Sequence, residues 1–282
     1  MPSRRVLPLL VISAAAAGLA GCGGGSSSTT TTAADDDLAS KTPQEILDAS
    51  VAAVADVHSY KIRGSVVDDD GRTVISASVR DDRSVKATYT TKGVTSSYLV
   101  VRGQGFVRGD RAYWLDGRSD ARSQRIARLL AGRWVKLSAG GAAALLKDVE
   151  RLMPKEQAYC LPKRIGTLTK VGVRTVRGRR VVVIRDAGNV PGGTPGELSV
   201  ATNGRALPMR ERQTGPSRPG GTFEPRCDDT DDTSTKSDAT LSHWDKVAPI
   251  RLPRNPLDPS RILPPRRTPG VPGAGPEGGL SA

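Results

Sequence analysis

The chain has 282 residues, and 42 Lys and Arg against 29 Asp and Glu give it a formal net charge of +13. Its 31 Gly and 20 Pro are concentrated partly in two low-complexity ends, so the foldable part is predicted to be a single domain. After the N-terminal segment no apolar run is long enough to span a bilayer, which excludes a multispan membrane protein. Three Cys and two His leave little material for a metal centre, and the composition favours binding over catalysis.

Residues 1–21 have the pattern of a secretory signal peptide. Arg4 and Arg5 precede an apolar stretch, residues 6–17, which is too short for a mature transmembrane helix. Residues 19–22, LAGC, match a bacterial lipobox, in which cleavage leaves a cysteine thiol at the new N-terminus. This predicts that Cys22 receives acyl chains such as palmitate, which anchor the protein to the extracytoplasmic face of the cell membrane. The alternative is an ordinary secretory signal with an incidental cysteine.

Two further segments have little to bury. Residues 22–41 consist mainly of Gly, Ser, Thr, Ala and Asp, and they predict a lipidated, flexible tether. Residues 249–282 are rich in proline and without periodicity, and they predict a disordered or extended tail. The folded domain is therefore expected to span residues 42–248.

The domain opens with a helix signal, in which Thr42 is placed as N-cap, Pro43 at the first helical position and Glu45 as the capping-box return. The helix is expected to end near Asp56, and from His58 the hydrophobic period changes to two. Alternation and turn residues then predict a meander of antiparallel strands at 58–68, 72–80, 84–91, 94–102, 104–108 and 111–115.

The second half begins with two predicted helices, residues 120–131 and 142–153, on either side of a short strand at 134–137; Pro154 is expected to end the second helix. Strands are predicted at 165–176, 180–186, 197–202, 205–213 and 239–244. Runs of hairpin-linked strands with helices gathered between them indicate an α+β fold. The polar alternate positions suggest a curved sheet with one face in water and helices against the other.

Cys160 and Cys227 are the cysteines that remain after Cys22 is acylated. In an exported protein an even pair usually forms a disulfide, and this bridge is the prediction here. Two independent buried thiols are the alternative.

Catalytic and cofactor signals are weak. His58 and His243 are not accompanied by a nucleophile motif, and no Cys or His spacing suits zinc, so neither an enzyme nor a cofactor nor a metal is expected. The acidic stretch 228–232 is expected to be a solvated loop, with weak calcium binding as the alternative. The basic excess is consistent with general solubility or with attraction to anionic lipids, whereas export argues against nucleic acid.

Several short motifs, in order along residues 42–250, resemble actinobacterial lipoproteins of the LppX/LprG type, which are relatives of the LolA lipoprotein carrier. They comprise the capped helix followed by SYKIRG (59–64), YWL (113–115), GRWVKL (132–137), the hairpin from LSVA (198–201) to Leu207-Pro208, and HWDKV (243–247). The resemblance implies a strongly curved antiparallel half-barrel with helices on its concave side and an apolar cavity for acyl chains. It also implies lipid or lipoprotein binding within the envelope, without catalytic residues.

Strand alternation assigns nine residues to the concave face and thus to the expected lipid cavity: Ile62, Val66, Ile75, Ala77, Val79, Ala87, Tyr89, Tyr98 and Val100. The leading hypothesis is a membrane-anchored carrier of lipids or lipoglycans. The alternative is an envelope regulatory or scaffold lipoprotein that binds a partner protein, in which the same residues pack as a filled core.

Overall fold

The computed structural model describes residues 38–163, 165–220, 227 and 235–259. The strands are β1 (Ser59–Asp68), β2 (Gly71–Arg80), β3 (Ser84–Thr91), β4 (Val94–Val101), β5 (Gln104–Gly109), β6 (Val135–Lys136), β7 (Leu168–Val176), β8 (Arg179–Asp186), β9 (Gly196–Ala201), β10 (Pro208–Gln213) and β11 (Lys236–Ser242). The helices are α1 (Pro43–Ala55), α2 (Arg111–Leu115), α3 (Ala121–Leu130), α4 (Ala139–Glu150) and α5 (Pro154–Cys160), with 3₁₀ turns η1 (Leu38–Ser40) and η2 (Leu161–Lys163). The predicted signal peptide, Cys22, most of the tether, the acidic stretch and residues 260–282 lie outside the described residues.

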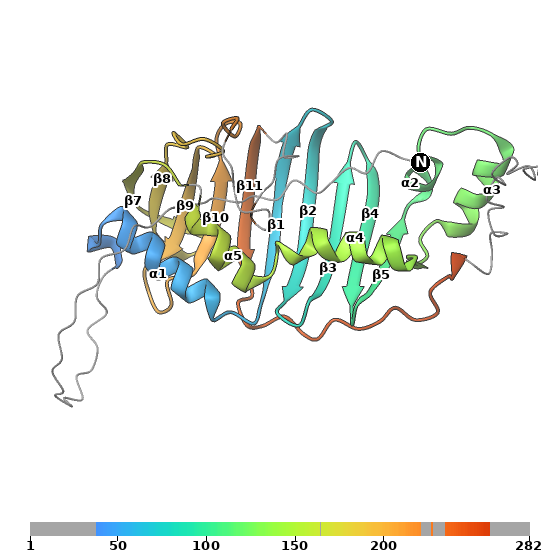
Figure 1. Ribbon diagram of the computed structural model, residues 1–282, viewed down its shortest axis with the longest axis horizontal. Coiled ribbons are helices and arrows are strands. Elements are labelled where there is room, and N and C mark those ends of the chain that lie inside the picture. The colour runs from blue at the N-terminus through green and yellow to red at the C-terminus, as the bar shows by residue number, and fades with distance from the viewer. Residues whose placement is uncertain (1–37, 164, 221–226, 228–234, 260–282) are drawn as a thin grey trace, which may run out of the picture.

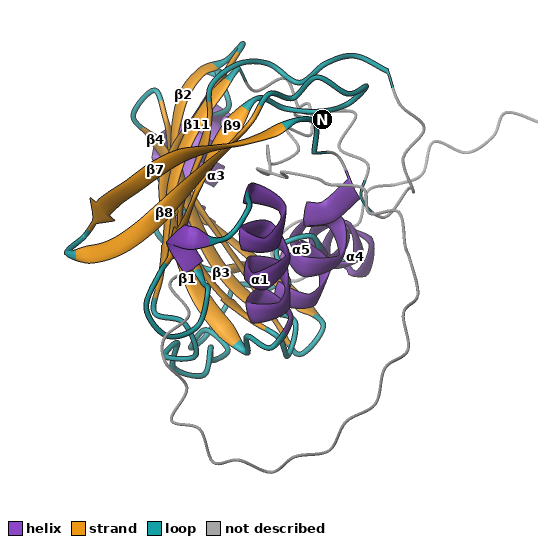
Figure 2. Ribbon diagram, turned by 90° about the vertical axis from the view of Figure 1, so that its left-hand side faces the viewer, coloured by secondary structure: helices purple, strands orange, loops and turns teal. Residues whose placement is uncertain are grey.

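All eleven strands form one antiparallel sheet in the order β6-β5-β4-β3-β2-β1-β11-β10-β9-β8-β7 (Figure 1). Two meanders, β1 to β5 and β7 to β10, are joined by β11, which pairs with β1 on one side and with β10 on the other. The sheet curves, and α1, α4 and α5 lie on its concave side (Figure 2). The predicted α+β class and curved half-barrel are confirmed.

Helix α1 begins as the capping pattern predicts. The Thr42 side chain accepts a hydrogen bond from the Glu45 amide at 3.3 Å, and the Glu45 carboxylate accepts one from the Thr42 amide at 2.8 Å. Ile46 and Leu47 are fully buried and pack against side chains of β8 and β9. The helix therefore covers the β8–β9 end of the concave face.

Residues 111–115 were predicted as a strand, and this prediction is wrong because they form helix α2. Asp110 causes the change: its side chain accepts a hydrogen bond from the Tyr113 amide at 2.8 Å and so caps the helix. The same carboxylate accepts a bond from the Thr95 amide at 2.6 Å, which fixes the helix start to the adjacent hairpin.

The predicted second helix, residues 142–153, corresponds to α4, and a further helix, α5, follows it that the sequence did not predict. α4 ends at Glu150, and Pro154, which was expected only to terminate a helix, occupies the first turn of α5. Proline suits this position because its missing amide has no helical partner there. The apolar stripe predicted for this segment packs on the sheet as expected, with Leu145, Val149 and Leu152 all buried.

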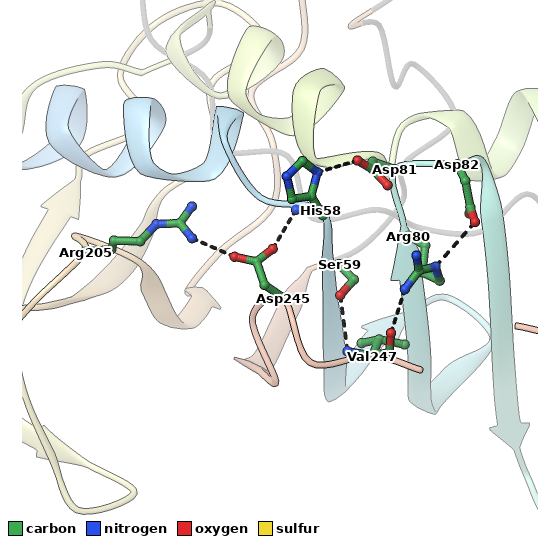
Figure 3. A network of polar contacts seen from close by, with 8 residues as sticks. All are labelled: His58, Ser59, Arg80, Asp81, Asp82, Arg205, Asp245 and Val247. Carbon is green, nitrogen blue, oxygen red and sulfur yellow. Dashed lines mark hydrogen bonds and ion pairs between the residues drawn. The ribbon is translucent and has the colours of Figure 1, made fainter. Parts of the chain in front are cut away.

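The segment after β11 is tied to the start of β1 and to the β9–β10 connection (Figure 3). Asp245 accepts hydrogen bonds from the His58 amide and from the Arg205 guanidinium, both at 2.6 Å. Burial alone would raise the pKa of the Asp245 carboxyl, but these donors outweigh it and hold the pKa below its ordinary value. The Val247 carbonyl accepts a bond from Arg80 at 2.6 Å. The HWDKV motif thus has a structural role, because it joins the start of β1 to the β9–β10 connection and so links the two meanders.

The chain continues along the sheet past residue 248. The Leu257 amide donates to the Trp134 carbonyl at 2.7 Å, and its carbonyl accepts from the Lys136 amide at 2.8 Å. These bonds lie within the segment that the sequence assigns to the tail. In the part of the chain that the structure describes, no helix is long and apolar enough to cross a membrane.

Candidate functional site

A pocket lies between the concave face of the sheet and the α4–α5 junction. Its cavity volume is about 60 Å³. It is lined by Tyr60, Ile62, Gly64, Ser65, Val66, Ile75, Ala77, Tyr89, Leu152, Gln157, Glu211, Ala239 and Leu241. Most of these side chains are apolar, so the pocket offers a surface for hydrocarbon rather than for a polar substrate.

Strand register explains why residues so distant in sequence share this surface. Directly paired positions run across five strands from Glu211 to Ala239, Gly64, Ile75 and Tyr89. Paired residues project to the same face of a sheet, and this row crosses from β1, β2 and β3 to β10 because β11 pairs with both β1 and β10. The pocket is therefore a product of both meanders.

Gly64 is required at the floor of the pocket. A Cβ atom at this position would lie 2.3 Å from the Asp238 carbonyl oxygen and 2.6 Å from the Ala239 Cα atom. Such distances are far inside van der Waals contact, so only glycine permits β1 and β11 to approach this closely here.

The α4–α5 junction covers the pocket through Leu152 and Gln157. The Tyr60 hydroxyl donates a hydrogen bond to the Leu152 carbonyl at 2.7 Å, and the Gln157 amide donates one to the Arg151 carbonyl at 2.6 Å. The first bond fastens the junction to β1, and the second joins α5 to the residue that follows α4. The cover is thus tied to the sheet by the bond from Tyr60, and Leu152 is buried in the same cluster as residues of β1 and β2.

A disulfide joins Cys160, the last residue of α5, to Cys227, with a Cα–Cα distance of 5.4 Å. This is the pairing that the sequence predicts. The bridge connects the helix over the pocket to a segment 67 residues away. It therefore restricts the movement of α5 relative to the rest of the chain.

Burial alters the titration of three groups in the pocket. It raises the pKa of the Glu211 carboxyl to about 7, and it raises the pKa values of the Tyr60 and Tyr89 phenols above their ordinary range. Both phenols are therefore neutral at physiological pH. Glu211 changes its charge in that range.

The nine residues predicted for the cavity all lie on the concave face, since β1 to β4 pair them in register. Five of them line the pocket: Ile62, Val66, Ile75, Ala77 and Tyr89. The structure places the other four, Val79, Ala87, Tyr98 and Val100, in or against a close-packed cluster with side chains of α4. The reason is that α4 lies over that part of the sheet and Leu145 and Val149 fill the space there.

Sequence reasoning missed the pocket residues on β10, β11 and α5. The period-two pattern of residues 205–213 would place Glu211 on the same face as Met209. A register irregularity between Pro208 and Arg210 separates them: Met209 packs with Val181 and Val183, and Glu211 lies opposite Leu198 on the concave side. No local signal in the sequence reveals this irregularity.

The histidines have no site of their own. His58 bonds Asp81 at 2.6 Å just before the start of β1 (Figure 3), and His243 bonds the adjacent Ser242 at 3.1 Å. Among the described residues, no group of three or more His, Cys, Asp or Glu side chains could hold a metal ion.

No protein-family model and no curated protein matches the sequence. Among solved structures, LprF from Mycobacterium bovis aligns with 77% of this chain and 100% of its own at 15% identity, with a TM-score of 0.44. The Mycobacterium tuberculosis lipoprotein LppX aligns with 74% of this chain and 99% of its own at 13% identity, also with a TM-score of 0.44. MucB aligns with 74% of this chain and 60% of its own at 12% identity, with a TM-score of 0.35. The structural neighbours of this chain include LprF and LppX.

Proposed function

We propose that this chain is an exported, membrane-anchored lipoprotein that binds the acyl chains of a lipid or lipoglycan and carries them within the cell envelope. The observation that carries this proposal is the apolar pocket between the concave face and the α4–α5 junction. An apolar concave site with few polar groups is the usual form of a site for a hydrophobic ligand. The proposed activity is binding and transfer, without a chemical step.

The size of the pocket determines how a chain would bind. A cavity of about 60 Å³ is smaller than the ~150 Å³ cavity that holds a benzene ring in an engineered protein. An acyl chain would therefore enter by displacing the α4–α5 junction from the sheet. Each methylene buried in this way contributes about 0.8 kcal/mol, so a long chain can offset the contacts that the junction loses.

The anchor part of the proposal is tested at Cys22. We expect Cys22→Ala to abolish incorporation of an alkyne fatty acid fed to the host, because the thiol that receives the diacylglyceryl group is gone. In-gel fluorescence after metabolic labelling measures this. Cys160→Ala is the matched control and should be labelled like the wild type, since Cys160 lies in the disulfide. Undiminished label in Cys22→Ala would contradict the lipobox.

A scaffold lipoprotein that binds a partner protein is the second candidate. The observation in its favour is that α4 fills the concave face over Val79, Ala87 and Val100, each no more than 1% exposed. A face packed to this extent needs no ligand for its stability. The two candidates differ in whether the pocket is occupied when the protein is isolated from its own host.

The variants Ala77→Leu and Ala87→Leu distinguish the lipid carrier from the scaffold lipoprotein. Both alanines lie on the same row of the sheet and in the same buried cluster, but Ala77 also lines the pocket, whereas Ala87 does not. We expect wild-type protein from its own host to carry lipid in native mass spectrometry, and Ala77→Leu to lose most of it with little change in thermal midpoint. Ala87→Leu overpacks a filled core and should cost about 1–3 kcal/mol.

Two outcomes of this experiment would favour the scaffold. One is lipid-free wild-type protein. The other is an Ala77→Leu variant that is as destabilised as Ala87→Leu and retains whatever the wild type carries.

A further inference from the structure

The pocket contains one carboxylic acid. Of the described residues that line it, Glu211 is the single Asp or Glu, and none is Lys, Arg or His. It occupies the end of the concave row next to Ala239. An ionisable group in an otherwise apolar wall is a marker of ligand recognition, because such a group is costly to maintain without a role.

Within the described part of the chain, Glu211 has no hydrogen-bond or ion-pair partner, and burial alone accounts for the shift of its pKa. The arginines on either side of it in sequence belong to the opposite face. Arg210 pairs there with Asp238 at 2.8 Å, and Arg212 is in register with Glu197. The carboxyl group is thus left without a cation.

The groups that line the pocket with Glu211 are polar but uncharged. They belong to Tyr60 and Ser65 on β1, Tyr89 on β3 and Gln157 on α5. The Tyr60 hydroxyl is already used by the Leu152 carbonyl, and the Gln157 amide nitrogen by the Arg151 carbonyl. Among the described residues no hydrogen bond joins any of these groups to Glu211, so its carboxyl group remains available to a donor on a ligand.

We propose, on the basis of the lipid-binding function above, that Glu211 selects neutral acyl lipids that carry a hydroxyl group and rejects the anions of free fatty acids. A hydroxyl can donate to the ionised carboxylate and accept from the protonated acid, so it satisfies Glu211 in either state. A fatty-acid carboxylate would place a second negative charge in the same small apolar space, where charges are weakly screened. The pocket thus favours an acylglycerol-like ligand.

Three probes with the same acyl chain test the proposal at pH 8: 1-monopalmitoylglycerol, palmitate and methyl palmitate. The wild type should bind monopalmitoylglycerol about tenfold more tightly than either of the others, as expected for one hydrogen bond to a charged group. Glu211→Gln keeps a polar partner without the charge. Its affinity for palmitate should therefore rise, and its affinity for monopalmitoylglycerol should stay close to that of the wild type. Glu211→Leu should bind the three probes with similar affinity.

Asp238→Asn is the matched control, because this carboxylate lies on the adjacent strand but is paired with Arg210 on the other face. It should show the wild-type order of affinities. Equal binding of all probes by the wild type, or an unchanged order in Glu211→Leu, would overturn the selection by Glu211 and leave acyl binding intact. Failure of every probe to bind the wild type would instead overturn the proposed function itself.

Discussion

At pH 8, Glu211→Gln is expected to unfold with a free energy roughly 2–3 kcal/mol higher than that of the wild type. The wild-type carboxyl has its pKa raised from 4.5 to about 7 by burial, so at pH 8 the folded protein holds an unpaired charge in an apolar pocket. In the unfolded chain the same charge is hydrated. Glutamine removes this penalty while keeping the shape of the side chain.

The sign of the pH dependence follows from the raised pKa. Between pH 4.5 and about 7 the folded wild type binds more protons at Glu211 than the unfolded chain does, so its stability falls as the pH rises through this window. Below the window the penalty is absent, and the two proteins should differ little at pH 4. Urea titrations at pH 4, 6 and 8 measure this.

Asp238→Asn provides the comparison for the urea titrations, because Arg210 lowers the pKa of Asp238. Loss of this charge should give no gain in stability at pH 8. If Glu211→Gln and the wild type show parallel stability from pH 4 to pH 8, Glu211 is not desolvated in solution, and the argument for its role in recognition loses its electrostatic support.

Removal of the disulfide in the variant Cys160→Ala/Cys227→Ala is expected to lower the free energy of unfolding by about 4 kcal/mol. The bridge closes a loop between residues 67 positions apart, and the unfolded chain regains this conformational freedom when the link is absent. Urea unfolding without reductant measures the difference. The wild type in reductant should behave like the double variant.

The loss should also be visible locally. α5 ends at Cys160 and carries Gln157 over the pocket, so its amides should exchange faster with solvent in the variant than those of α1, which packs on the β8–β9 end. Equal stability of the two proteins, or alkylation of both cysteines in the oxidised wild type, would contradict a bridge in solution.

Local patterns were sufficient for much of the fold. The capping box at Thr42 and Glu45 forms as predicted, because its bonds involve only neighbouring residues. The concave assignment of residues such as Ile62 and Val100 is also correct, because successive side chains of an unbroken strand must alternate between faces. Where a side chain competed locally with this pattern, as Asp110 does at α2, the same reasoning failed.

The pocket itself was decided by the tertiary structure. Alternation shows which residues share a face, but not which of them border open space. Ala77 and Ala87 are paired neighbours in one buried cluster, yet only Ala77 lines the pocket. Glu211 reaches the concave side only because a register irregularity in β10 shifts the alternation. It shares a row with Gly64 of β1 only because β11 pairs with both β1 and β10. Both depend on pairing between distant strands. The sequence alone thus determined the capping box of α1 and the faces of the regular strands, whereas long-range strand order and helix placement decided where the open space lies and which charge it contains.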